Sequence, residues 1–119
     1  MNGNLSAIER ELAAQILKQN PKHQNTLGNQ LEYLTVVSRK ATGVGCYITF
    51  AVPAEKIADV KLNTLLGFNG EIRVEGVPSG LCCVMDVTDG RINYFELVTY
   101  GDELWGGDLE KAQIIPEKT

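Results

Sequence analysis

The first twenty residues have the hydrophobic spacing of one amphipathic helix. Ser6 and Glu9 form a capping-box pattern, in which each side chain bonds a free amide at the helix start. The helix should end near Gln19, because Pro21 disfavours a helical residue before it and has no N–H to continue the ladder. Aliphatic residues recur every three or four positions along one face of this predicted helix: they are Leu5, Ile8, Leu12 and Ile16.

The middle of the chain has the residue types of β-strands. Lys22–Gln30 is polar and is predicted to be a loop. Leu31–Arg39 and Cys46–Val52 are rich in β-branched and aromatic residues, and the glycines between them predict a hairpin. Residues 53–66 leave two alternatives open, a short helix or a structured crossover.

The second half gives the clearest β pattern. Leu81–Val87 and Arg91–Thr99 flank the dipeptide Asp89-Gly90, a combination typical of tight hairpin turns. Glu71–Glu75 predicts a short strand before them, and Lys111–Ile115 predicts a short edge strand near the C-terminus.

These elements predict an α+β fold, with an N-terminal helix packed on a curved antiparallel sheet of about five to six strands. The chain has 119 residues. This length suits a single domain covering residues 1–119, since a second core would be too small to be stable alone.

Composition favours a soluble, cytoplasmic protein. The start of the chain has no basic region followed by an apolar run, so it does not resemble a signal peptide. No apolar stretch approaches the roughly 20 residues of a membrane-spanning helix. The three cysteines are odd in number and Cys82 directly precedes Cys83, which favours free thiols that behave as small hydrophobes.

The chain shows no motif for a cofactor, a metal or catalysis. His23 is the only histidine, and no cluster of His and Cys has zinc-ligand spacing. Gly43 and Gly45 lack the third glycine and the following helix of a phosphate-binding loop. We therefore expect no cofactor, no metal and no enzymatic activity. An enzyme that uses paired Asp and Glu side chains remains an alternative.

Charge divides the chain into two unlike halves. Residues 1–61 have a net charge of +2 and residues 62–119 a net charge of −6. Between Ile92 and Glu110 there are five acids and no base. Such a segment repels nucleic acids and anionic membranes and attracts a basic protein.

The acidic segment also contains aromatic residues, and this combination predicts a protein-binding surface. Aromatic side chains supply much of the binding energy at interfaces, and charges steer association. In the alternative interpretation, Trp105 folds back over one end of the sheet and the acids only solvate the surface. The predicted binding residues of this segment are Tyr100, Asp102, Glu103, Trp105 and Asp108.

Glu96 is a further candidate. Strand alternation places it on the same sheet face as Tyr94 and Val98, whereas Phe95 and Leu97 point the other way. If the face of Glu96 is the core, its carboxylate needs a buried partner.

Two short stretches resemble small bacterial immunity proteins. Residues 84–96 read VMDVTDGRINYFE, and residues 100–105 read YGDELW. In that family a D-G-x-I turn leads into a strand with a Phe/Leu-Glu pair, followed by an aromatic and acidic segment. Many family members have a proline where Gly106 stands here.

The resemblance implies a function by direct protein contact. Such proteins neutralise toxins of polymorphic-toxin and contact-dependent growth-inhibition systems. The implied partner is a cognate toxin domain, basic and nuclease-like, which an acidic immunity protein can block with carboxylates in the place of phosphates. The alternatives are a general protein-binding or regulatory domain and a small enzyme.

Overall fold

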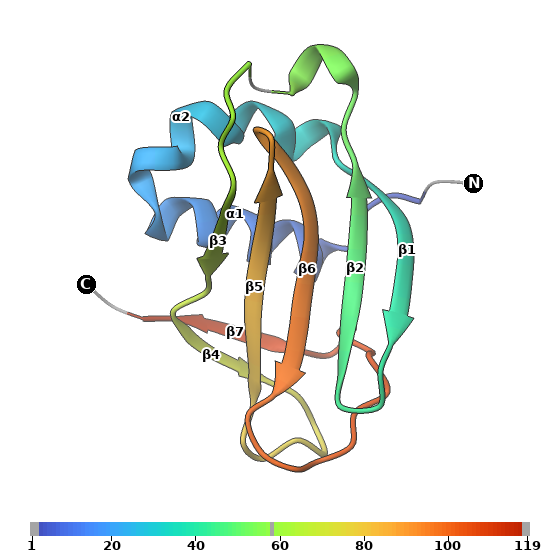
Figure 1. Cartoon of the computed structure of the whole chain (residues 1–119). Coiled ribbons are helices and arrows are strands. Elements are labelled where there is room, and N and C mark those ends of the chain that lie inside the picture. The colour runs from blue at the N-terminus through green and yellow to red at the C-terminus, as the bar shows by residue number, and fades with distance from the viewer. Residues whose placement is uncertain (1–2, 58, 118–119) are drawn as a thin grey trace.

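The computed structural model describes residues 3–57 and 59–117. It has two layers, and Figure 1 shows the helices behind a large sheet whose near face is uncovered. The helical elements are α1 (Ala7–Gln19), the 3-10 turn η1 (Pro21–His23), α2 (Gln24–Leu27), and the 3-10 turns η2 (Gly28–Tyr33) and η3 (Ala54–Lys56). The strands are β1 (Thr35–Ala41), β2 (Gly45–Ala51), β3 (Thr64–Gly67), β4 (Gly70–Arg73), β5 (Leu81–Thr88), β6 (Arg91–Thr99) and β7 (Gln113–Pro116).

The strands form two antiparallel sheets. Five strands make the large sheet in the order β1-β2-β6-β5-β3, and β4 pairs with β7 in a separate two-stranded sheet. The predicted α+β class and the packing of the helix on an antiparallel sheet are confirmed. The segment predicted to add an edge strand near the C-terminus instead forms the second sheet with β4.

Helix α1 begins as its capping box predicts. The Ser6 hydroxyl accepts the Glu9 N–H (3.2 Å), and the Glu9 carboxylate accepts the Ser6 N–H (2.8 Å). The helix ends at Gln19, and the Asn20 side-chain amide donates to the Ile16 carbonyl (2.7 Å). Leu12 and Ile16 are fully buried, so this face of the helix belongs to the core.

Strand alternation decides which face of the large sheet is buried. Along β5, buried positions alternate strictly with half-buried ones. Phe95 and Leu97 of β6 are buried, and the Phe95 ring meets Phe50 of β2 edge-to-face at 4.9 Å. A register shift beside Asp86 inserts one extra residue in β6, which lets Ile92 point into the core as well.

The prediction of a loop over Lys22–Gln30 is wrong. Residues 21–33 form consecutive short helical turns, which also take the first residues of the predicted strand Leu31–Arg39. Pro21 begins the first turn, where its missing N–H costs nothing. Leu27 and Gln30 of these turns are buried against the sheet, and this long-range packing has no local periodic signal.

Glu9 of α1 is buried, although it does not belong to the predicted apolar face of the helix. Glu9 is turned toward the sheet, where Arg39 of β1 donates two hydrogen bonds of 2.7 Å to its carboxylate. Burial alone would raise the pKa of Glu9, but the bonds from Arg39 and Ser6 outweigh it and lower that pKa. This paired contact ties α1 to β1.

No helix among residues 3–57 and 59–117 has the length and apolar character needed to cross a bilayer.

Candidate functional site

The loop after β6 presents large apolar side chains to solvent at one end of the large sheet. In Figure 1 this loop lies at the lower end, beside the β1–β2 turn and the β4–β5 connection. Tyr100 is 65% exposed and Leu104 is 80% exposed, and Val44 of the β1–β2 turn is 41% exposed. Asp102 lies between the first two in sequence and is also exposed. Single exposed apolar side chains are ordinary on protein surfaces, whereas several that lie close together indicate an interaction site.

Hydrogen bonds hold this loop to three neighbouring segments. The Tyr100 N–H donates to the Gly80 carbonyl (3.1 Å), and the Trp105 N–H donates to the Gly43 carbonyl (2.9 Å). The buried Thr99 hydroxyl lies 3.2 Å from the carbonyl oxygens of both Gly101 and Glu103. The loop is therefore ordered before any partner binds, although its apolar side chains are exposed.

Glu103 is held in place by the turn before β5. Its carboxylate accepts the Ser79 N–H (2.9 Å), and this bond lowers the pKa of Glu103. A carboxyl group with an ordinary pKa is already ionised at neutral pH, and the bond extends the ionised range of Glu103 to lower pH. A Cβ at Gly101 would collide with this carboxylate, so glycine at that position leaves room for the bond.

We refer to Val44, Tyr100, Asp102, Glu103 and Leu104 together as the acidic tip. Within the described part of the chain, the ion pairs are Glu9–Arg39 and Glu71–Arg73, so the acids of the tip have no cationic partner there. The tip thus combines exposed apolar area with uncompensated negative charge.

Trp105 does not belong to this surface. Its side chain is only 6% exposed and forms part of the core, and its indole N–H donates to the Asp108 carbonyl (3.3 Å). The structure therefore agrees with the alternative in which Trp105 covers one end of the sheet. As placed here, its ring is not accessible as an anchor for a partner, which is a correction to its proposed role.

Glu96 lies on the uncovered face of the large sheet, not in the core. The Tyr47 hydroxyl of β2 donates to its carboxylate (2.7 Å), which raises the pKa of Tyr47. The rings of Tyr47 and Tyr94 meet edge-to-face at 5.7 Å. Glu96 is therefore exposed and on a different part of the surface from the loop after β6.

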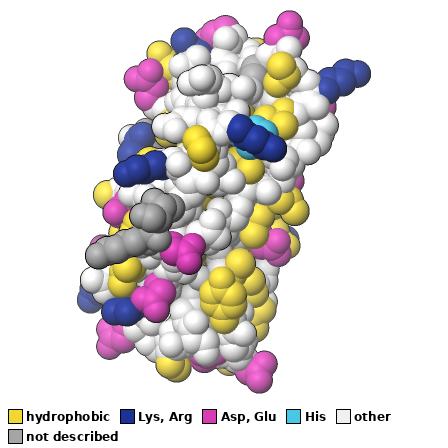
Figure 2. Space-filling model, turned by 90° about the vertical axis from the view of Figure 1, so that its left-hand side faces the viewer, with side chains coloured by type: hydrophobic (Ala, Val, Ile, Leu, Met, Phe, Trp, Pro, Cys, Tyr) yellow, Lys and Arg dark blue, Asp and Glu magenta, His cyan; other side chains and the backbone are white. Residues whose placement is uncertain are grey.

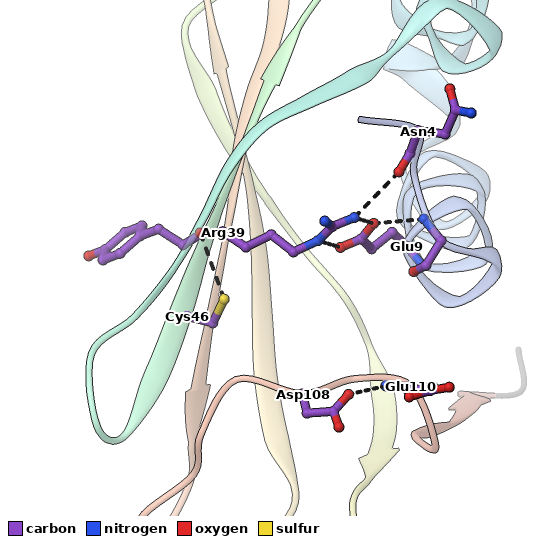
Figure 3. A network of polar contacts seen from close by, with 8 residues as sticks. Asn4, Glu9, Arg39, Cys46, Asp108 and Glu110 are labelled. Atoms are coloured by element: carbon purple, nitrogen blue, oxygen red, sulfur yellow. Dashed lines mark hydrogen bonds and ion pairs between the residues drawn. The ribbon is translucent and has the colours of Figure 1, made fainter. Parts of the chain in front are cut away.

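Asp108 lies on the other side of the molecule, near the start of α1. Its carboxylate accepts the Glu110 N–H (2.8 Å), so it stabilises a turn before β7. Figure 3 shows this turn together with Arg39, which extends from β1 to Glu9. The two regions line a shallow cavity of about 450 Å³. The structure thus does not bring Asp108 together with Tyr100, Asp102 and Glu103.

Sequence reasoning missed the two aliphatic members of the acidic tip. Leu104 lies inside the segment that was singled out, but its hydrophobicity alone suggests burial. Val44 is part of a hairpin turn, where an apolar residue between Gly43 and Gly45 has no partner within the strands. The position of Val44 between two turn glycines could have predicted that its side chain is exposed.

Two of the three cysteine thiols, those of Cys46 and Cys83, are buried. Burial raises the pKa values of Cys83 and Cys46, which keeps these thiols protonated and weakly nucleophilic. Among the residues that the structure describes, no three His, Cys, Asp or Glu side chains converge in a way that fits a metal ion.

Comparisons with protein-family models, curated proteins and solved structures gave no match.

Proposed function

We propose that this protein is a toxin-neutralising immunity protein that binds and blocks a basic, nuclease-like toxin domain by direct contact through the acidic tip. The observation that carries this proposal is the exposure of Tyr100 and Leu104 beside acids that have no cationic partner in the described residues. The apolar side chains would supply affinity and the carboxylates would supply attraction and orientation.

Electrostatics supports a basic partner. The segment from Ile92 to Glu110 has five acids and no base, and the hydrogen bond from Ser79 holds the Glu103 carboxylate in place. Nuclease active sites are positively charged because they hold phosphate groups. Carboxylates at a protruding tip suit such a site, and long-range attraction accelerates the encounter.

The ordered backbone of the tip supports binding rather than catalysis. The N–H groups of Tyr100 and Trp105 donate to backbone carbonyls, and the Glu103 carboxylate accepts the Ser79 N–H. These bonds fix the loop, so little conformational entropy is lost when a partner docks. Residues 84–96 and 100–105 resemble immunity proteins, and this resemblance is the reason to expect a toxin domain as the partner.

Charge reversal at the tip tests the proposal. The partner to test is the product of the gene directly upstream, because an immunity gene usually follows the gene of its toxin. Asp102→Lys with Glu103→Lys should slow association about tenfold or more at low salt and reduce its salt dependence. Stopped-flow or surface-binding kinetics at low and moderate salt measure this effect.

The matched control changes the same charge at the opposite end of the sheet. Glu55→Lys with Asp59→Lys alters two exposed acids and should leave the association rate within about twofold. Thermal unfolding of both variants checks that the fold is intact. Equal association rates for the two double variants would show that the tip is not the binding site. Failure of the wild-type protein to bind the toxin or to rescue growth of cells producing it would overturn the function itself.

A further inference from the structure

A pocket of about 310 Å³ opens directly beside the acidic tip. It lies between β4, the connection to β5 and the ring of Tyr100. Buried side chains of Val77 and Leu81 contribute to its wall, and Pro78 and Ser79 lie at its rim. Figure 2 views the molecule from the side of β3 and β4, and low on this side hydrophobic side chains gather beside acidic ones.

The size of the pocket restricts its ligand. Its volume is at the lower limit of cavities that bind small molecules or cofactors. It is open to solvent and adjoins an exposed loop, which suits one side chain of a docked protein. Its apolar walls fit an aliphatic stem, and Tyr100 contributes an aromatic side chain to the lining.

The charge at the rim selects the head group of that side chain. Glu71 and Arg73 both line the pocket, but they pair with each other at 2.7 Å and compensate each other's charge. Glu103 is bonded to the rim residue Ser79 and has no cationic partner among the described residues. Glu103 does not itself line the pocket, but its bond to Ser79 places a negative charge beside the opening.

We propose that this pocket receives an arginine side chain from the protein partner, with its stem against Val77 and its guanidinium between Tyr100 and Glu103. This inference rests on the proposed function for the basic character of the partner. Arginine combines an apolar stem with a planar cation that stacks on aromatic rings and pairs with carboxylates. Lysine has the same charge but lacks the planar group, so it should bind more weakly.

A titration with blocked tripeptides tests the pocket without the toxin. The probes are acetyl-Gly-Arg-Gly-amide and the same peptide with citrulline, lysine or norleucine in the centre. Binding is followed by the amide signals of Ser79, Gly80 and Tyr100 in two-dimensional NMR spectra of the labelled protein. We expect saturable shifts with arginine in the millimolar range. Citrulline is nearly isosteric and neutral, and it should bind about fivefold or more weakly because the ionic contact is lost.

Two variants and one control connect the shifts to the proposed contacts. Tyr100→Ala removes the ring and Glu103→Gln removes the charge, and each should weaken binding of the arginine peptide severalfold. Tyr33→Ala is the control, since Tyr33 is exposed at a distant site where Lys56 already lies 4.4 Å from the ring centre. It should leave the titration unchanged.

Several outcomes would overturn the arginine pocket. These are the absence of saturable shifts, equal affinity for arginine and citrulline, or an arginine titration unaffected by Tyr100→Ala. Equal affinity for arginine and lysine would reduce the site to a general cation contact and overturn the role of the planar group. If the peptide binds as expected but the toxin does not bind, the proposed function fails and the pocket stands. If the toxin binds and Asp102→Lys with Glu103→Lys slows its association, but the arginine peptide gives no saturable shifts, the pocket assignment fails alone.

Discussion

The two ends of the large sheet are both ordered by hydrogen bonds, but the two most exposed large apolar side chains among the described residues lie at one of them. At the β5–β6 turn, the buried Gln30 donates to the Gly90 carbonyl (2.7 Å) and accepts the Ile92 N–H (2.9 Å). The Gly90 N–H also donates to Leu62 (3.0 Å). At the acidic tip, bonds from Tyr100 and Trp105 fix the backbone equally well, yet Tyr100 and Leu104 remain exposed.

This difference separates stability from recognition. The end held by Gln30 closes the core, because a buried amide satisfies two backbone groups that water does not reach. The tip has the same local order without the burial, so its apolar side chains contribute little to folding. Apolar side chains that are ordered but exposed are the feature expected of a binding surface that is organised in advance.

Substitution of Trp105 should have the largest effect on stability, because this residue directly follows the tip in sequence but belongs to the core. Trp105→Ala should lower the free energy of unfolding by about 3–5 kcal/mol, through lost burial and the cavity left behind. Chemical denaturation measures this loss. Trp105→Phe keeps most of the apolar volume and should cost clearly less. A change below about 1 kcal/mol would show that the ring is not packed and would return Trp105 to the list of contact residues.

Substitution of Gln30 tests whether its side chain stabilises the β5–β6 turn. Gln30→Ala leaves the Gly90 carbonyl and the Ile92 N–H without their buried partner, which should cost about 1–3 kcal/mol of unfolding free energy. The exposed neighbour Asn29 supplies the control, and Asn29→Ala should stay within about 0.5 kcal/mol. Amide hydrogen exchange at Ile92 should also become faster in Gln30→Ala. If exchange there is unchanged, the turn is held by other contacts.

Local sequence signals predict the elements that depend on local chemistry. The capping box and spacing of α1 and the Asp89-Gly90 turn of β5–β6 lead directly to the observed helix and hairpin. The turns over residues 21–33 could not be predicted this way, since Gln30 is fixed by groups sixty residues away. The Glu9–Arg39 pair has the same long-range origin.

The candidate site was predictable in its charge but not in its shape. Counting charges finds Asp102 and Glu103 in a segment without bases. It does not reveal that Trp105 is buried while Leu104 is exposed, because both are apolar neighbours in one irregular loop. Trp105 is held inward by contacts from distant parts of the loop and the fold, the bond from its N–H to Gly43 and the bond from its indole N–H to Asp108.

Leu104 provides the smallest expected effect on stability and the sharpest contrast with Trp105. With a side chain 80% exposed, Leu104→Ser should change the free energy of unfolding by less than about 0.5 kcal/mol. The same substitution should speed dissociation from the toxin domain, because lost apolar contact acts mainly on the dissociation rate. Denaturant unfolding and binding kinetics on one preparation separate the two effects. A destabilisation above about 1 kcal/mol would mean that Leu104 is packed in solution. The two ends of the sheet would then not differ in the way proposed, because the tip would be closing the core as the Gln30 end does.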